Sequence, residues 1–228
     1  MNLTLTSNLP TTPIEAVYQL MRSTGKRPRI AWIPPSIEIN LERFAAARKL
    51  FDIHGFDRLE VVSIDVSQNG SSARLADYDV VYLSGGDPVR FRTHLLQGNL
   101  AAELRNYIET GKMIVASSGG SLQFTKNISV FRLIELEVDE VIVQWSEYKA
   151  LDIVPYEFLP HLNVHSESFL EKVRLYSQAI DHPIIGVEDG GALIHKSINE
   201  YQVVGRASIF RHGDIEIIRG GDINARLI

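Results

Sequence analysis

The chain has 228 residues, of which 45% are hydrophobic, and its formal net charge is -5. This length and apolar content fit one globular domain, residues 1–228, with a substantial core. The acidic balance, with the 23 Lys and Arg residues scattered along the chain, argues against a nucleic-acid partner. Cysteine is absent, which excludes disulfides, thiolate metal sites and every mechanism that uses a cysteine nucleophile.

The N-terminal segment, Met1 to Ser7, lacks the basic stretch and the long apolar stretch of a secretory signal. No apolar run approaches the length that spans a membrane. We therefore expect a cytoplasmic protein without a membrane partner.

Short β-rich runs alternate with longer helical patterns, which is typical of an α/β fold with a mainly parallel sheet. Helical spacing predicts a first helix that opens at Thr12-Pro13, with Thr12 as its cap, and a second over 41–51 that stops near Gly55. Apolar runs in this half of the chain predict strands at 3–6, 29–33, 59–64 and 80–83.

In the second half, a helical pattern covers 89–108 with a break near Gly98, and another covers 166–179 with Ser166 as its cap. Further apolar runs predict strands at 113–117, 184–187, 192–195, 201–204 and 215–218.

Residues 130–156 form a less regular stretch. Within it, Ile134, Leu136 and Val138 alternate with acidic residues, which predicts a half-buried, antiparallel strand. Because long excursions near the carboxyl edge of a sheet often cover active sites, we expect this stretch to set specificity.

The six residues from Ala116 to Ser121, with the sequence ASSGGS, lie between a predicted strand and a helix. A serine at such a turn projects its hydroxyl clear of the backbone, and small neighbours permit the tight turn and the approach of a substrate carbonyl. Ala116 replaces the first glycine of the Gly-x-Ser-x-Gly nucleophile elbow, and Gly120 keeps the last. Ser118 is therefore a candidate nucleophile, with a small residue in an ordinary turn as the alternative.

A serine nucleophile needs a base, and the base needs a group that orients it. His161 and His165 follow a strand-like run that would bring them beside the elbow, although packed or surface histidines are the alternative. Glu188 and Asp189 end a strand and could supply the carboxylate, although an Asp-Gly pair also fits a hairpin turn. The order Ser, His, acid differs from that of the α/β-hydrolases.

An oxyanion hole needs backbone N–H groups aimed at the developing negative charge. Gly119, directly after the candidate nucleophile, fits that role. A second donor is available in Gly85-Gly86, at the end of a neighbouring strand, where an ordinary strand-to-helix turn is the alternative.

Six segments carry a family likeness through most of the chain: Leu5-Thr6-Ser7-Asn8, Ile33-Pro34, Tyr82 to Pro88, Ser118-Gly119-Gly120, Pro160-His161 and Ile185 to Gly190. Together they resemble the peptidase E family of serine peptidases, which includes aspartyl dipeptidases and the related cyanophycinases. Gly85-Gly86-Asp87-Pro88 stands where that family has a Gly-Gly-Asn-Thr-like turn, and Ser118-Gly119-Gly120 stands where it has Ser-Ala-Gly.

The resemblance implies a three-layer α/β sandwich like that of the class I glutamine amidotransferases, with serine in place of the usual cysteine. It also implies hydrolysis in which Ser118 is the nucleophile, His161 the general base and Asp189 the orienting carboxylate, at a position where the family commonly has glutamate. Gly86 and Gly119 would supply the oxyanion N–H groups.

The expected function is therefore a serine hydrolase that cleaves short peptides without a metal or cofactor, as a monomer or homodimer. The resemblance adds a preference for an aspartyl residue on the amino side of the scissile bond. A catalytically silent binding or regulatory relative is the alternative, because Asp87-Pro88 and Asp189 depart from the family pattern. Arg90, Arg92 and Lys126 could bind a substrate carboxylate, but we assign them to the solvated surface.

Overall fold

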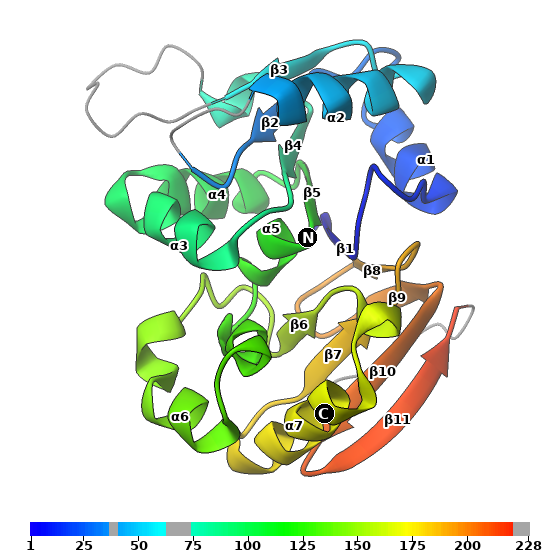
Figure 1. The fold of residues 1–228 in the computed structure, drawn as a ribbon. Coiled ribbons are helices and arrows are strands. Elements are labelled where there is room, and N and C mark those ends of the chain that lie inside the picture. Colours follow the sequence, from blue (N-terminus) through cyan, green and yellow to red (C-terminus); the bar gives the residue numbers. More distant parts are fainter. Residues whose placement is uncertain (37–40, 63–73, 221–228) are drawn as a thin grey trace.

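The computed structural model describes residues 1–36, 41–62 and 74–220, and within them the strands form two sheets (Figure 1). The strands are β1 (Leu3–Thr6), β2 (Ile30–Ile33), β3 (Leu59–Val61), β4 (Val80–Leu83), β5 (Met113–Ser117), β6 (Glu157–Leu159), β7 (Ile184–Val187), β8 (Ala192–His195), β9 (Tyr201–Val204), β10 (Arg206–Arg211) and β11 (Asp214–Arg219). The α-helices are α1 (Glu15–Ser23), α2 (Leu41–Ile53), α3 (Pro88–Gln97), α4 (Leu100–Glu109), α5 (Gly119–Leu122), α6 (Val138–Val143) and α7 (Glu167–Ala179).

The seven-stranded sheet has the order β3-β2-β4-β5-β1-β8-β9. Its first five strands run parallel, and β8 and β9 continue it antiparallel. The pairs Thr6 with Ser117 and Leu83 with Ala116 bring the carboxyl ends of β1, β4 and β5 to one edge. Residues that follow these strands, among them Ser7 and Ser118, therefore meet at that edge.

Helices cover both faces of this sheet, which explains why its strands are continuous apolar runs. In β4, Val81 and Leu83 pack in the core cluster that contains α3 and α4 residues. Val80 and Tyr82 point the opposite way, into the cluster that contains α1 and α2 residues. The mixed, mostly parallel α/β architecture predicted from the sequence is thus confirmed.

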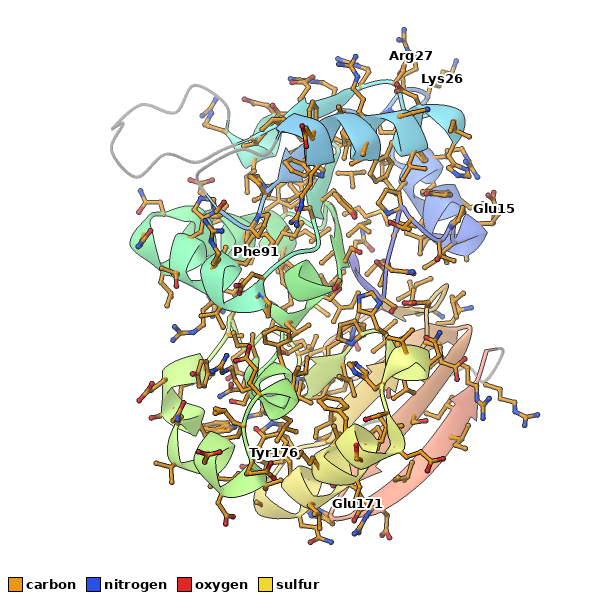
Figure 2. The ribbon with its side chains drawn as sticks, in the orientation of Figure 1. Glu15, Lys26, Arg27, Phe91, Glu171 and Tyr176 are labelled. Atoms are coloured by element: carbon orange, nitrogen blue, oxygen red, sulfur yellow. The ribbon has the colours of Figure 1, made fainter. Side chains whose placement is uncertain are left out.

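The second sheet has the order β11-β10-β7-β6, and only its β6–β7 pair is parallel. Phe158 of β6 and Ile185 of β7 belong to the same core cluster as residues of β1 and β5, so the two sheets share apolar packing. Figure 2 shows Phe91 of α3 and Tyr176 of α7 directed inward, whereas Arg27 and Glu171 lie on the outside. No helix in the described ranges is long and apolar enough to cross a bilayer.

The predicted strands at 3–6, 80–83, 113–117, 184–187, 192–195 and 201–204 are confirmed with unchanged bounds. The predicted break in the helical run is also confirmed, because α3 ends at Gln97 and α4 begins at Leu100. Strand β10 has no counterpart among the predicted strands. The predicted end of the third strand, Ile64, lies outside the described residues.

The predicted cap Thr12 is wrong. Helix α1 begins at Glu15, with Ile14 as an N-cap that makes no side-chain cap hydrogen bond. Thr12 belongs to the preceding turn, where its hydroxyl accepts from Asn8 Nδ2 at 2.8 Å.

The predicted half-buried strand around Ile134, Leu136 and Val138 is also wrong. That segment instead holds a 3₁₀ helix, η2 (Ser129–Ile134), followed by α6. Of the acidic residues in the alternation, Glu137 forms a reciprocal capping box with Glu140 at the start of α6, and Glu135 pairs with Arg132 at 2.7 Å.

Candidate active site

Ser118 lies at a strained turn between β5 and α5. Its φ and ψ are 48° and -119°, a conformation that non-glycine residues rarely adopt. The turn is held by Ser118 N, which donates to Thr6 O at 3.0 Å, and by Ser121 N, which donates to Ser118 O at 2.8 Å. This strand, strained serine and helix have the geometry of a nucleophile elbow.

The glycines after Ser118 allow the elbow to press against the turn that follows β4. A Cβ added at Gly120 would lie 2.6 Å from Ser84 O, closer than a real contact permits. A Cβ at Gly119 would clash with the carbonyl oxygen of Gly86. Small residues are therefore required here by backbone-to-backbone approach as well as by substrate access.

The structure brings Ser118, His161 and Asp189 together in one hydrogen-bonded chain. Ser118 Oγ lies 3.0 Å from His161 Nε2, and His161 Nδ1 lies 2.7 Å from Asp189 Oδ1. Because a carboxylate accepts hydrogen bonds, Nδ1 carries the proton and Nε2 is left to accept from the serine hydroxyl. The shorter side chain of aspartate, in place of glutamate, is therefore long enough to reach the imidazole.

His161 is itself held in an unusual backbone conformation. It follows β6 and Pro160, and its φ of 58° and ψ of 34° fall in the left-handed region. Its N–H donates to Ser7 Oγ at 2.8 Å. Two of the non-glycine residues at positive φ thus face each other across the site, which is typical of catalytic centres.

A polar support surrounds Asp189 that the sequence analysis did not assign. Ser7 Oγ donates to Asp189 Oδ1 at 2.8 Å, and the Asp189 N–H donates to Asn163 Oδ1 at 2.8 Å. Asn8 Oδ1 accepts from the neighbouring Gly190 N at 3.1 Å. The available signal was the position of Ser7-Asn8 directly after a predicted parallel strand, where polar residues meet at the sheet edge.

The two alternative site residues take no part in this hydrogen-bonded chain. His165 Nε2 donates to Pro160 O at 3.2 Å, and its ring stacks on Phe169 with centroids 4.3 Å apart. Burial lowers the pKa of His165, so its imidazole stays neutral near neutral pH. Glu188 faces Arg206, with Oε1 at 3.6 Å from Nε. In the described part of the chain, neither side chain is hydrogen-bonded to Ser118 or His161.

The glycine pair predicted for the oxyanion hole lies beside the elbow. Gly86 has φ of 138°, and an added Cβ would lie 2.8 Å from Pro35 Cγ, so only glycine fits there. The departures that follow it have a structural role: the Asp87 carboxylate accepts from Val89 N at 2.8 Å and Arg90 N at 3.1 Å, and Pro88 opens α3. Gly119 is the first residue of α5, where an N–H has no intrahelical acceptor.

Two cavities flank Ser118 and His161. The first has a volume of about 80 Å³ and is mainly apolar. Its lining residues are Gly86, Pro88, Ser118, Gly119, Leu122, Val130, Phe131, Ile134, Leu159, Pro160, His161 and His165. The second, about 290 Å³, lies on the side of Asn8, Trp32 and Arg43.

The basic residues near the site in sequence do not line either cavity. Arg90, Arg92 and Lys126 are missing from both linings, and Arg92 Nε instead donates to Lys149 O at 2.6 Å. Within the described part of the chain, no three His, Asp or Glu side chains come together as a metal site requires.

Comparisons with known proteins give the family and the fold that this chain resembles. The sequence model described as Peptidase family S51 matches residues 4–200. The chain is 25% identical over 224 residues to a protein named peptidase E from Shewanella denitrificans, covering 94% of this chain and 91% of that one.

Two solved structures share the fold. One is a peptidase from an acI-B1 Actinobacterium, with a TM-score of 0.71 and 17% identity, covering 97% of this chain and 95% of that chain. The other is a peptidase E candidate from Listeria monocytogenes EGD-e, with a TM-score of 0.58 and 19% identity, covering 96% of this chain and 98% of that chain.

Proposed function

This chain belongs to peptidase family S51, and on that premise we propose that it is a serine hydrolase that cleaves short peptides through Ser118, His161 and Asp189. One observation carries the proposal: a strained serine at an elbow is hydrogen-bonded to an imidazole, which is hydrogen-bonded in turn to a carboxylate. The Shewanella relative is named peptidase E, which supports peptidase activity in this chain. The finer fold assignment, a three-layer sandwich like that of the class I glutamine amidotransferases, is part of the same proposal.

In the first half of the reaction, Ser118 Oγ attacks the scissile carbonyl carbon while His161 Nε2 takes the hydroxyl proton. Asp189 stabilises the imidazolium that forms. The N–H groups of Gly86 and Gly119 donate to the negatively charged oxygen of the tetrahedral intermediate. The C–N bond then breaks, and His161 returns the proton to the leaving amine.

In the second half, water attacks the acyl-enzyme and His161 accepts a proton from it. A second tetrahedral intermediate collapses, which releases the carboxylic acid and restores the Ser118 hydroxyl. None of these steps needs a metal or an organic cofactor.

The proposal is tested by incubating the purified protein with a panel of dipeptides and tripeptides and measuring the amines released. We expect Ser118→Ala to lower kcat/KM by about 10⁴-fold or more, because the nucleophile is removed. The matched control is Ser23→Ala, an exposed serine of α1, which is expected to keep full turnover.

A fluorophosphonate probe, which labels activated serines, supplies a second readout. Labelling of the wild-type protein that is lost in Ser118→Ala supports the hydrolase. Turnover that survives in Ser118→Ala removes Ser118 from the mechanism. No turnover and no labelling in the wild-type protein would favour the catalytically silent relative.

A further inference from the structure

We propose that the substrate residue on the acyl side of the scissile bond carries an apolar side chain, and that this side chain occupies the first cavity beside Ser118. This inference rests on the proposed hydrolase function. It departs from the aspartyl preference that the family resemblance implies.

The walls of the cavity are chemically suited to hydrocarbon. Helix η2 contributes Val130, Phe131 and Ile134 to the lining. Leu159 of β6 and Leu122 of α5 complete the apolar part. The polar atoms of the lining belong to the reacting groups and to His165. A carboxylate placed among such side chains would lose its water without gaining a partner, which is strongly unfavourable.

The described residues that line this cavity supply no fixed positive charge to pair with an aspartyl carboxylate. Among the described residues, the lining holds no Lys or Arg, and burial keeps His165 neutral by lowering its pKa. Arg43 lines the second cavity instead, where its Nη1 lies 3.3 Å from the place that a Cβ of Gly86 would take.

The position of the cavity assigns it to the acyl side. A substrate carbonyl attacked by Ser118 directs its oxygen at the N–H groups of Gly86 and Gly119, and both residues line this cavity. The side chain on the adjacent α-carbon therefore enters the same space. The second cavity contains Arg43 but neither of these two glycines, which makes it the position for the leaving portion.

The size of the cavity limits what it can hold. Its volume of about 80 Å³ has room for about five to eight water-sized groups. A leucine or phenylalanine side chain has a similar number of heavy atoms, whereas a folded or extended polypeptide does not fit. The cavity thus selects a single apolar side chain.

The first experiment holds the leaving group constant and varies only the acyl residue, with the 4-nitroanilides of Leu, Phe, Asn and Asp. We expect kcat/KM to be at least about 100-fold higher for Leu or Phe than for Asp. Asn, which has the shape of Asp without its charge, separates the effect of charge from that of size. A higher kcat/KM for Asp than for Leu would overturn the proposal even if turnover depends on Ser118.

The second experiment measures binding without turnover, so that its failure is distinct from failure of the hydrolase proposal. Leu-Gly and Asp-Gly are titrated calorimetrically into the Ser118→Ala protein. Tighter binding of Leu-Gly supports the inference whether or not the wild-type protein hydrolyses peptides. Tighter binding of Asp-Gly, or no binding of either at millimolar concentration, overturns it.

Charge-introducing variants locate the side chain. Ile134, 53% exposed, can accept an arginine at the cavity wall without burying it, so Ile134→Arg should shift the Asp-to-Leu ratio of kcat/KM at least about 10-fold toward Asp. Ile217 of β11 is 55% exposed and lines neither cavity, so Ile217→Arg is the matched control and should leave the ratio unchanged. An Asp preference that disappears in Arg43→Gln would place the side chain in the second cavity and contradict the proposal.

Discussion

The hydroxyl of Ser7 connects two members of the proposed catalytic triad. It accepts from the His161 N–H and donates to Asp189 Oδ1, both at 2.8 Å. Ser7 is buried, and its own N–H donates to Gly191 O at 3.1 Å, so its position is fixed by the backbone. Ser7 is therefore a positioning residue, which holds the imidazole and the carboxylate in register without touching the substrate.

We predict that Ser7→Ala lowers kcat by about 10- to 100-fold and leaves KM nearly unchanged, because a base misplaced by a fraction of an ångström transfers protons poorly. Steady-state kinetics on a cleaved peptide measure this split. Ser7→Thr keeps the hydroxyl and should recover part of the loss.

Ser177→Ala is the matched control for that prediction. Ser177 is also buried, and its hydroxyl also donates and accepts, to Arg174 O at 2.7 Å and from Gly213 N at 3.0 Å. Both variants should lose roughly 1–3 kcal/mol of unfolding free energy. Only the Ser7 variant should lose kcat, and an equal loss of kcat in both would mean that Ser7 acts on stability alone.

Between elements, the elbow and the turn after β4 depend on each other. The Gly86 carbonyl occupies the place that a Cβ of residue 119 would take. That turn contains Asp87-Pro88, with Asp87 capping α3, where the resembled family has Asn-Thr. The glycine at 119, where the family has alanine, is thus matched to this particular turn.

We predict that Gly119→Ala, although it introduces the common residue of the family, lowers kcat/KM at least about 10-fold and destabilises the fold by about 1–3 kcal/mol. The elbow or the turn must shift to accept the methyl group. Activity assays and urea denaturation measure the two effects.

The triple variant Asp87→Asn, Pro88→Thr, Gly119→Ala tests whether the turn is the cause. If it is, the losses of activity and of unfolding free energy in the triple variant should be smaller than the sum of the losses in the three single variants. Full additivity would contradict the coupling.

The same element scale shows what the sequence could and could not predict. Runs such as Val80–Leu83 were predictable as strands because both of their faces are buried, which leaves an uninterrupted apolar signature. The alternation around Ile134 was misleading because Glu137 caps α6 and Glu135 pairs with Arg132, whereas a strand would turn both toward solvent. Alternation of apolar and polar residues over so few positions does not distinguish a half-buried strand from the capped start of a helix.

Local motifs and family resemblance were enough to predict the candidate residues Ser118, His161 and Asp189. They did not predict Ser7, which positions two of these residues. Ser7 lies 154 residues from His161 and 182 from Asp189 in sequence. Such contacts follow from strand order, which the sequence pattern does not determine. The same limit explains why the sequence did not reveal that the strands divide between two sheets.

At the scale of the whole molecule, the candidate site lies where the two sheets meet. Ser118 and Ser7 follow β5 and β1 of the large sheet, whereas His161 and Asp189 follow β6 and β7 of the small one. Parallel pairing of Leu159 with Gly186 aligns the ends of β6 and β7, so that the residues beyond them meet. The relative position of the sheets therefore controls the distance between nucleophile and base.

A buried polar cluster lies behind β6 and connects it to its neighbours. Glu157 is fully buried, and its carboxylate accepts from Val130 N at 2.9 Å and from the Tyr176 hydroxyl at 2.8 Å. His182 Nε2 lies 3.1 Å from the same carboxylate, and its Nδ1 lies 2.8 Å from Asp181. Burial alone would lower the pKa of His182, but the hydrogen bonds to Glu157 and Asp181 outweigh it and raise the pKa above 6.5.

His195, at the end of β8, has the opposite character. Its Nδ1 donates to Ser197 O at 3.2 Å, and its Nε2 accepts from the Tyr156 hydroxyl at 2.6 Å, so the neutral ring is satisfied at both nitrogens. Burial lowers its pKa from 6.5 to about 4. The two histidines therefore impose opposite pH dependences on the free energy of unfolding.

We predict a maximum of that free energy near pH 6.5. The folded state holds the His182 proton more tightly than the unfolded state, so this contribution is complete below pH 6.5 and is lost as the pH rises through the higher folded pKa. As the pH is lowered, the unfolded state binds a proton at His195 before the folded state does. The free energy of unfolding therefore falls, by on the order of 3 kcal/mol, as the pH drops from 6.5 to about 4. Urea denaturation across this range measures both limbs. His182→Gln should flatten only the alkaline limb and His195→Gln only the acidic one; if His182→Gln leaves the alkaline limb unchanged, a different group controls it.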